Sequence, residues 1–231
     1  MNITTIILLF TSVILAVIIV EVFKTDKTQN INLLLTFSGA YLLAVTTQHL
    51  IPEVFSSKQD NSIGIFILIG FLFQIILEYF SKGIEHGHYH KNSSIPISVL
   101  VSLSIHAFIE GIPLSGEHLD THAHNGLLTG IIMHKLPVSI VLLTIFLKNG
   151  TSKIKAYFFL LIFASMSPLG VLASNMIKDI NIYHDEIMAI VIGILLHIST
   201  TIIFESSNEH QFSRSKILCI ILGVVIAIIS I

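Results

Sequence analysis

The chain has 231 residues, of which 53% are hydrophobic and only 11% are charged, and its mean hydropathy is +0.88. Soluble domains carry roughly a quarter charged residues, so this composition excludes an ordinary water-soluble globule and a disordered chain. A formal net charge of −2 excludes the basic field that nucleic-acid binding needs, and the single cysteine, Cys219, excludes an internal disulfide. The composition predicts an all-α integral membrane protein.

Eight apolar segments follow one another along the chain, and short polar connections separate them. A spanning helix needs about 20 mainly apolar residues. The predicted spans are Ile3–Phe23, Ile31–Phe55, Ile63–Phe80, Ile95–Leu114, Gly126–Leu147, Ile154–Ile177, Ile187–Glu205 and Ile217–Ile231. The first lacks the basic start and cleavage site of a signal peptide, so we expect a retained helix. The last is short, so it must begin earlier, thin the bilayer or lie partly inside the bundle. We expect one transmembrane domain over residues 1–231.

The lysine and arginine residues of the connections predict the orientation of the helices. Because consecutive connections lie on opposite sides, nine basic residues fall on one side and two, Lys58 and Lys178, on the other. The richer side is expected to be cytoplasmic. Both termini are then extracytoplasmic, in a multi-pass protein of the plasma or inner membrane.

Four ionisable residues lie within the predicted spans. His106 and Glu110 are four residues apart on the fourth span, so they share one face of the helix. His134 and Lys135 lie at a similar depth on the fifth span, which a short connection makes an antiparallel neighbour. Burying a carboxylate at the centre of a membrane costs about 2.5 kcal/mol or more, so ionisable residues there usually serve a function.

Two imidazoles and a carboxylate are ligands that suit Zn²⁺, and also Fe²⁺, Mn²⁺, Co²⁺, Ni²⁺ or Cd²⁺. Pro113 and Pro137 interrupt the helices close to the same level. Broken helices at mid-membrane are typical of ion sites in transporters. The alternative is that these side chains only form hydrogen bonds between helices.

Other polar residues allow two interpretations each. His49 and Glu53, four apart at the outer end of the second span, form either an entrance site or a hydrated helix end. His197, in the seventh span, is either a ligand or a buried histidine that bonds a neighbouring hydroxyl, and Glu78 is expected to be a solvated helix end. His86, His88 and His90, in a connection on the cytoplasmic side, either bind metal loosely or are solvated.

Several of these stretches together resemble the ZIP (Zrt/Irt-like) divalent-metal transporters. The second span, with Gln48-His49-Leu50-Ile51-Pro52-Glu53, is similar to a family motif that ends in H-L-L-P-E. The pair His106-x-x-x-Glu110 with Gly111 matches the family signature, and His134-x-x-Pro137 matches half of H-E-x-P-H-E. Ser167-Pro-Leu-Gly170 matches the sixth helix of the family.

The resemblance implies eight helices, with helices one to three and six to eight as inverted repeats around helices four and five. It implies uptake of a divalent metal, foremost Zn²⁺, toward the cytoplasm, with His106, Glu110 and His134 as ligands. The chain departs from the family at Ala107, Lys135, Val138 and Ser139, where ligands of a second metal are found in relatives. We therefore expect Lys135 to take the place of a second metal.

Two other functions are alternatives to transport. One is a membrane protein that binds or senses metal without transporting it. The other is an intramembrane metalloenzyme, but no H-E-x-x-H motif occurs in the sequence, so we expect no enzyme. The expected partners are the divalent ion and the lipid bilayer, with a homodimer as a further candidate and no nucleic acid.

Overall fold

The structure is a computed structural model that describes residues 3–23, 28–57, 62–81, 97–115, 121–177, 182–205 and 213–230. Within these ranges nearly every residue is helical and no strand occurs. The elements are α1 (Ile3–Phe23), α2 (Thr28–Val45), the π-helical turn η1 (Thr46–Leu50), α3 (Ile51–Ser57), α4 (Ser62–Ser81), α5 (Ile97–Gly111), the 3-10 turn η3 (Ile112–Ser115), α6 (Thr121–Lys148), α7 (Lys153–Met176), α8 (His184–Glu205) and α9 (Arg214–Ser230).

The described helices correspond closely to the predicted spans. Seven stretches are long and apolar enough to cross a membrane, and α2, η1 and α3 together make one of them. The helix at the C-terminal end, α9, has 17 residues and is not among the seven. It begins three residues before the predicted start at Ile217, which is one of the three possibilities that its short apolar segment left open. The structure therefore supports a multi-pass helical protein with seven clear spans.

Proline and glycine set several helix boundaries. Pro113 has no N–H to donate, and the α-helical part of α5 ends at Gly111 and gives way to the 3-10 turn η3. Gly150 adopts φ 77° just after α6, the left-handed conformation that glycine adopts easily at a helix end. In the second span the Ile51 N–H donates to the Thr46 carbonyl, one residue further back than in an α-helix. This π-helical register lies directly before Pro52.

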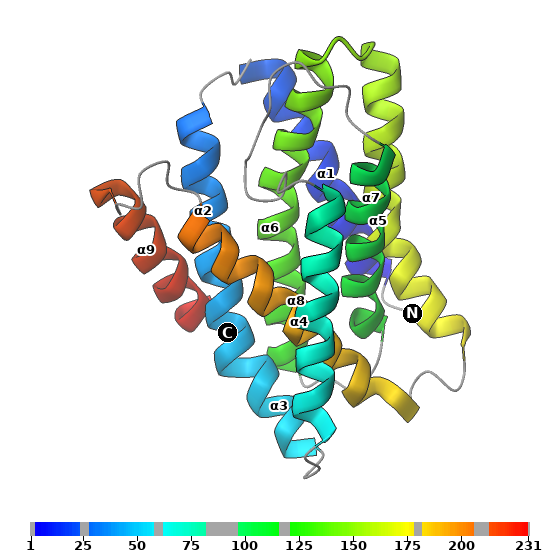
Figure 1. The fold of residues 1–231 in the computed structure, drawn as a ribbon, viewed down its shortest axis with the longest axis vertical. Helices are drawn as coiled ribbons and strands as arrows, with labels where there is room; N and C mark the ends of the chain where they lie inside the picture. The colour runs from blue at the N-terminus through cyan, green and yellow to red at the C-terminus, as the bar shows by residue number, and fades with distance from the viewer. Residues whose placement is uncertain are drawn as a thin grey trace.

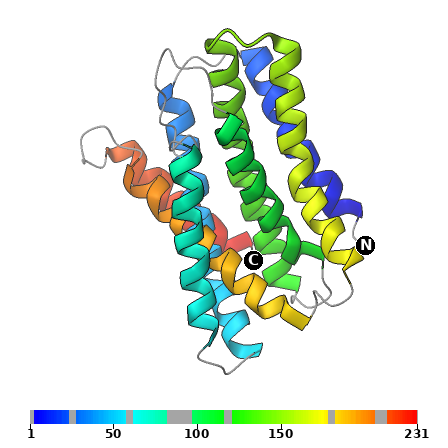
Figure 2. The same ribbon diagram turned by 45° about the vertical axis from the view of Figure 1, so that its right-hand side comes forward.

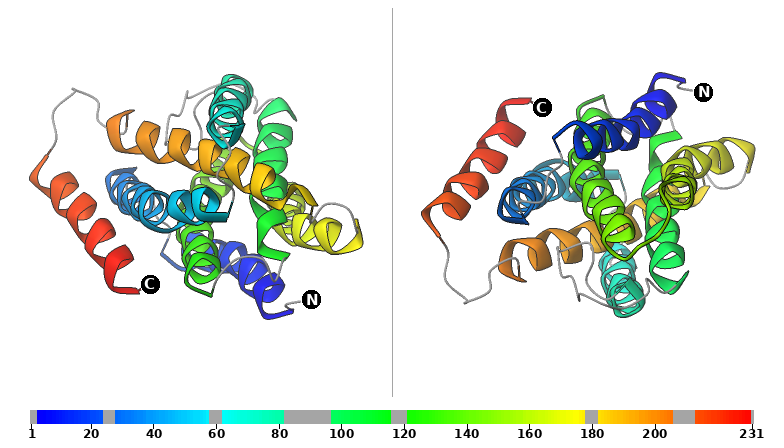
Figure 3. Two further views of the ribbon diagram at one scale, coloured as in Figure 1. Left: turned by 90° about the horizontal axis from the view of Figure 1, so that it is seen from below. Right: turned by 90° about the horizontal axis from the view of Figure 1, so that it is seen from above.

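The helices pack as two sets. The first set consists of α1, α5, α6 and α7, and the second of α2, α3, α4, α8 and α9. Within the second set, α8 crosses α4 obliquely and α9 lies against α2 at the edge of the molecule (Figure 1, Figure 2). Seen along its long axis, the molecule holds α6 between α2 and the remaining helices of the first set (Figure 3). α6 is the most enclosed of the candidate spans.

Glycines bring two helix pairs into backbone contact. A Cβ added to Gly111 of α5 would lie 2.2 Å from the Ser167 carbonyl oxygen of α7, and one added to Gly170 of α7 would lie 2.1 Å from the Phe108 carbonyl oxygen of α5. In the same way, a Cβ added to Gly70 of α4 or to Gly193 of α8 would lie 2.0 Å from a backbone carbonyl oxygen of the other helix. Small residues of this kind let membrane helices approach closely.

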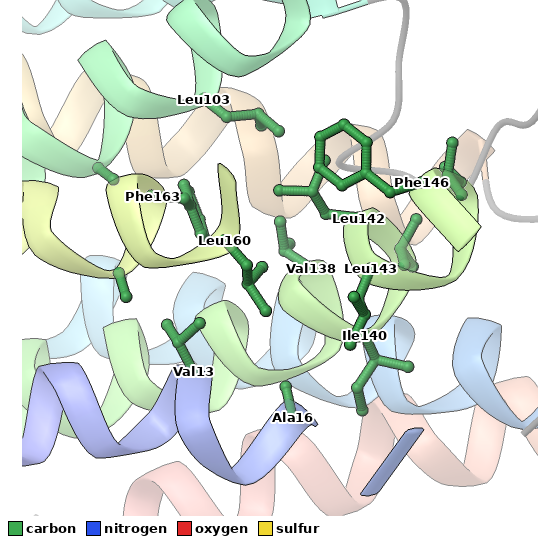
Figure 4. Close-up of a cluster of buried hydrophobic side chains, with 14 of the residues drawn as sticks. Val13, Ala16, Leu103, Val138, Ile140, Leu142, Leu143, Phe146, Leu160 and Phe163 are labelled. Carbon is green, nitrogen blue, oxygen red and sulfur yellow. The ribbon is translucent and has the colours of Figure 1, made fainter. Parts of the chain in front are cut away.

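The largest apolar cluster lies in and beside the first set. Figure 4 shows Val13 and Ala16 of α1, Val138, Leu142 and Leu143 of α6, and Leu160 and Phe163 of α7 packed together. On the surface, Glu21 of α1 accepts hydrogen bonds from Lys153 and Tyr157 of α7. These contacts join α1, α6 and α7, so the first set forms a continuous support around the polar residues described next.

Candidate functional site

His106 and Glu110 lie on the buried face of α5. Both are 3% exposed, and His106 Nε2 is 3.2 Å from Glu110 Oε2. The contact follows from their spacing, because residues four apart are neighbours on one face of a helix. The predicted common face is therefore present.

His134 and Lys135 lie near the middle of α6 and are also buried, at 3% and 2% exposure. The rings of His106 and His134 meet edge to face with their centroids 6.3 Å apart. Lys135 Nζ is 3.7 Å from Glu110 Oε1. The structure thus brings together all four ionisable residues that the sequence singled out.

The packing neighbours of α5 and α6 differ from the prediction. We expected them to pack as direct neighbours, but α5 packs mainly against α7 and α4, and α6 mainly against α1 and α2. The physical reason is that the glycine contact of α5, at Gly111, faces α7. α5 and α6 therefore meet through side chains, polar ones at His106 and His134 and apolar ones at Leu103 and Leu142, and not through closely packed backbones.

Ser167 and Phe163 of α7 complete the site. The Ser167 hydroxyl is fully buried, lies 3.0 Å from Glu110 Oε1 and 2.8 Å from the Ala107 carbonyl oxygen, and accepts a hydrogen bond from Lys135. Lys135 Nζ also lies over the Phe163 ring, 4.9 Å from its centroid. The sequence indicates Ser167 only as part of the motif in the sixth span, and it does not indicate Phe163. The signal for Ser167 was a hydroxyl beside a proline in the middle of an apolar span.

The ligand groups lie close together but are not gathered around one point. Within the described ranges, no three His, Cys, Asp or Glu side chains are arranged to hold a metal ion. Two imidazoles that share an ion at ~2 Å from each nitrogen would have centroids about 5 Å apart. The observed 6.3 Å is wider than this, so the two rings must move closer together before both can bind one ion.

The positions where the sequence departs from the expected family pattern are apolar or take part in hydrogen bonds within α6. Ala107 and Val138 belong to the main hydrophobic cluster and are 0% and 2% exposed. In Figure 4, Val138 lies between Leu142 and Leu160. The Ser139 hydroxyl donates to the Lys135 carbonyl at 2.7 Å. Ala107 and Val138 therefore pack in the apolar cluster, and the Ser139 hydroxyl is used in a hydrogen bond within α6.

The remaining candidates lie in the second set of helices or outside the described residues. His49 in η1 and Glu53 in α3 are half-buried. His197 of α8 contacts the Glu78 carboxylate of α4 and packs edge to face on Phe71. Glu78 is therefore not simply a solvated helix end, because α4 and α8 pack closely enough to join the two side chains. His86, His88 and His90 lie outside the described residues.

Comparison with known proteins identifies one family. A family model described as "ZIP Zinc transporter" matches residues 81–230, which is more than half of the chain. The match contains every residue of the buried polar site. The comparison with curated proteins gave no match.

Proposed function

Since the chain belongs to the ZIP zinc transporter family, whose members carry divalent metals across membranes, we propose that it transports Zn²⁺ or a similar ion through the buried site on α5 and α6. The proposed ligands are His106, Glu110 and His134. The observation that supports this assignment best is their joint burial: all three are 3% exposed and in contact through His106.

The cost of this burial favours a functional role. Polar and charged groups away from water destabilise a protein unless partners compensate them. A site of two imidazoles and one carboxylate is typical of borderline divalent metals such as Zn²⁺, Fe²⁺, Co²⁺, Ni²⁺ and Cd²⁺, with Mn²⁺ at the harder end.

We further propose that the site holds one ion and that Lys135 takes the place of a second. The ammonium group already lies 3.7 Å from one carboxylate oxygen of Glu110, and Ala107 and Val138 offer no ligand. Two unit charges 4 Å apart interact by about 4 kcal/mol at an effective dielectric of 20. A second divalent cation beside Lys135 would meet a repulsion of at least this order.

The distribution of basic residues supports an orientation with both termini extracytoplasmic. Nine basic residues in the connections or at the adjoining helix ends lie on the proposed cytoplasmic side, and two lie on the other. Uptake toward the cytoplasm is proposed because the resemblance to the ZIP transporters implies that direction. We propose that α9 forms the eighth span and that helices one to three and six to eight are inverted repeats. We also propose that the protein lies in the cell membrane and forms a homodimer there.

Two further places are proposed to bind metal more weakly. One is the outer end of the second span at His49 and Glu53, where an ion would enter. The other is His197, next to Glu78, near the end of α4 that the charge distribution places toward the cytoplasm. His86, His88 and His90 are proposed to collect ions after release.

Uptake by reconstituted protein tests the proposal against the alternative of binding without transport. Liposomes that contain the purified chain and a zinc-sensitive dye are given external Zn²⁺. We expect accumulation above that of empty liposomes, and its loss in Glu110→Ala. Glu21→Ala, which removes a carboxylate of α1 outside the site, is the matched control. Saturable binding without accumulation would support a sensor, and normal uptake by Glu110→Ala would reject the site.

A further inference from the structure

We infer that Lys135 determines the metal specificity of the site: its ammonium group, held by Glu110, Ser167 and Phe163, directs the site toward ions that favour imidazole ligands, such as Zn²⁺, and away from Mn²⁺. This inference rests on the proposed function, because it concerns the same site. It goes further by naming the feature that selects among divalent ions.

Three groups hold the ammonium group in place. Lys135 Nζ donates to the Ser167 hydroxyl, lies 3.7 Å from Glu110 Oε1 and lies 4.9 Å from the centre of the Phe163 ring. The face of an aromatic ring attracts a cation, and a buried carboxylate and hydroxyl do the same. Lys135 is 2% exposed, so protein groups form nearly all of its surroundings. The lysine is thus held as a fixed cation beside the metal ligands.

The two oxygens of Glu110 face different partners. Oε1 lies 3.0 Å from the Ser167 hydroxyl and 3.7 Å from Lys135 Nζ. Oε2 lies 3.2 Å from His106 Nε2, on the side of the histidines. Oε1 therefore pairs with the lysine. Oε2 can bind an ion together with His106 and His134.

This division changes which ions the site favours. With neutral imidazoles, the −1 charge of Glu110 is balanced by the +1 charge of Lys135. An arriving ion must then be held mainly by nitrogen ligands and by one carboxylate oxygen. Imidazole suits Zn²⁺, Ni²⁺ and Cu²⁺, whereas Mn²⁺, Mg²⁺ and Ca²⁺ depend on carboxylate, carbonyl and water ligands. The lysine therefore penalises hard ions more than Zn²⁺.

Equilibrium dialysis of the purified full chain at one fixed pH, with Zn²⁺ and with Mn²⁺ as separate probes, tests this inference. We expect Lys135→Met to bind both ions more tightly and to narrow the ratio of the Mn²⁺ to the Zn²⁺ dissociation constant by about tenfold or more, since the hard ion gains most from a carboxylate without a competing cation. Lys155→Met, which removes an exposed lysine at the start of α7, is the matched control and should leave the ratio unchanged. An unchanged ratio in Lys135→Met would overturn the inference.

Variants of Ser167 provide a second test of the inference, in which Lys135 is unchanged. In Ser167→Ala the ammonium group loses its hydroxyl partner and is drawn more fully to Glu110. We expect the Mn²⁺ to Zn²⁺ ratio to rise, Ser167→Thr to restore it, and Ser167→Ala to have no effect on the ratio in a Lys135→Met background. The same double-mutant cycle, measured on the unfolding temperature of metal-free protein, should show that the two side chains stabilise each other. An equal effect of Ser167→Ala with and without Lys135 would mean that Ser167 acts only on packing, and would overturn its role.

The two proposals fail in different ways. If the unmodified chain binds neither ion, or if His106→Ala, Glu110→Ala and His134→Ala leave binding unchanged, the proposed site is wrong. If binding depends on these three residues but selectivity does not depend on Lys135, the site stands and the specificity inference falls. Lys135→Gln, which keeps a polar end group for Ser167, replaces Lys135→Met in the same comparison if the latter does not fold.

Discussion

Glu110 has two separable roles at the scale of single residues. It is proposed to bind the ion, and it balances the buried charge of Lys135 at 3.7 Å. Removing one member of a buried ion pair leaves the other uncompensated, which typically costs about 3–5 kcal/mol.

We therefore expect Glu110→Ala to lower the unfolding temperature of the metal-free protein clearly. The double variant Glu110→Ala/Lys135→Met should recover most of the lost stability, because no unpaired charge remains, yet it should still not transport. Thermal unfolding in detergent and uptake in liposomes measure the two properties separately. A double variant as unstable as Glu110→Ala would show that the Glu110–Lys135 pair does not stabilise the fold.

The sequence predicted the ionisable residues of the site because each is costly within an apolar span. His106, Glu110, His134 and Lys135 stand out against their surroundings for that reason. Ser167 and Phe163 do not, since a hydroxyl and an aromatic ring are common in membrane helices. The contact between Glu78 and His197 was also missed, because it depends on how α4 and α8 pack and not on either helix alone.

At the scale of the elements, polar connections and prolines made the spans predictable to within a few residues. α1 matches its prediction, whereas α6 begins at Thr121, five residues before the predicted start at Gly126. The π-helical turn at Thr46–Leu50 could not be predicted from the sequence. Hydropathy does not indicate whether a backbone N–H will donate to the carbonyl four or five residues before it. The neighbours of α5 could not be predicted either, because they follow from glycines on facing helices.

The contact between α5 and α7 leads to a prediction about packing. A Cβ at Gly111 would lie 2.2 Å from the Ser167 carbonyl oxygen, so Gly111→Ala must push α7 away. We expect a loss of stability of roughly 1–3 kcal/mol, as for other overpacked sites, together with weaker metal binding because Ser167 moves. Gly64→Ala is the matched control, since nothing lies within 4 Å of an added Cβ there. Unchanged unfolding temperature and metal affinity in Gly111→Ala would contradict the backbone contact.

At the scale of the whole molecule, the charge distribution predicts the orientation in the membrane. In a Cys219→Ser background, single cysteines at Lys58 and Lys178 should react with a membrane-impermeant thiol reagent in intact cells. Cysteines at Lys27 and Lys148 should react only after permeabilisation. Labelling in the opposite pattern would reverse both the orientation and the proposed direction of uptake.

The histidine-rich connection provides a second prediction at this scale. Replacing His86, His88 and His90 together by serine should leave the initial rate of uptake in liposomes largely unchanged, because these residues lie outside the predicted spans. The retention of ions on the cytoplasmic side should fall. A complete loss of uptake would place the connection on the transport path itself.

One divalent ion is proposed to bind between α5 and α6 at His106, Glu110 and His134. Crystals of the full chain grown with Zn²⁺, with anomalous scattering measured at the zinc edge, test it most directly. We expect one strong peak inside the helices, within bonding distance of these three side chains and on the side of Glu110 opposite Lys135. Two adjacent peaks with Lys135 turned away from both, or no peak near these residues, would contradict it.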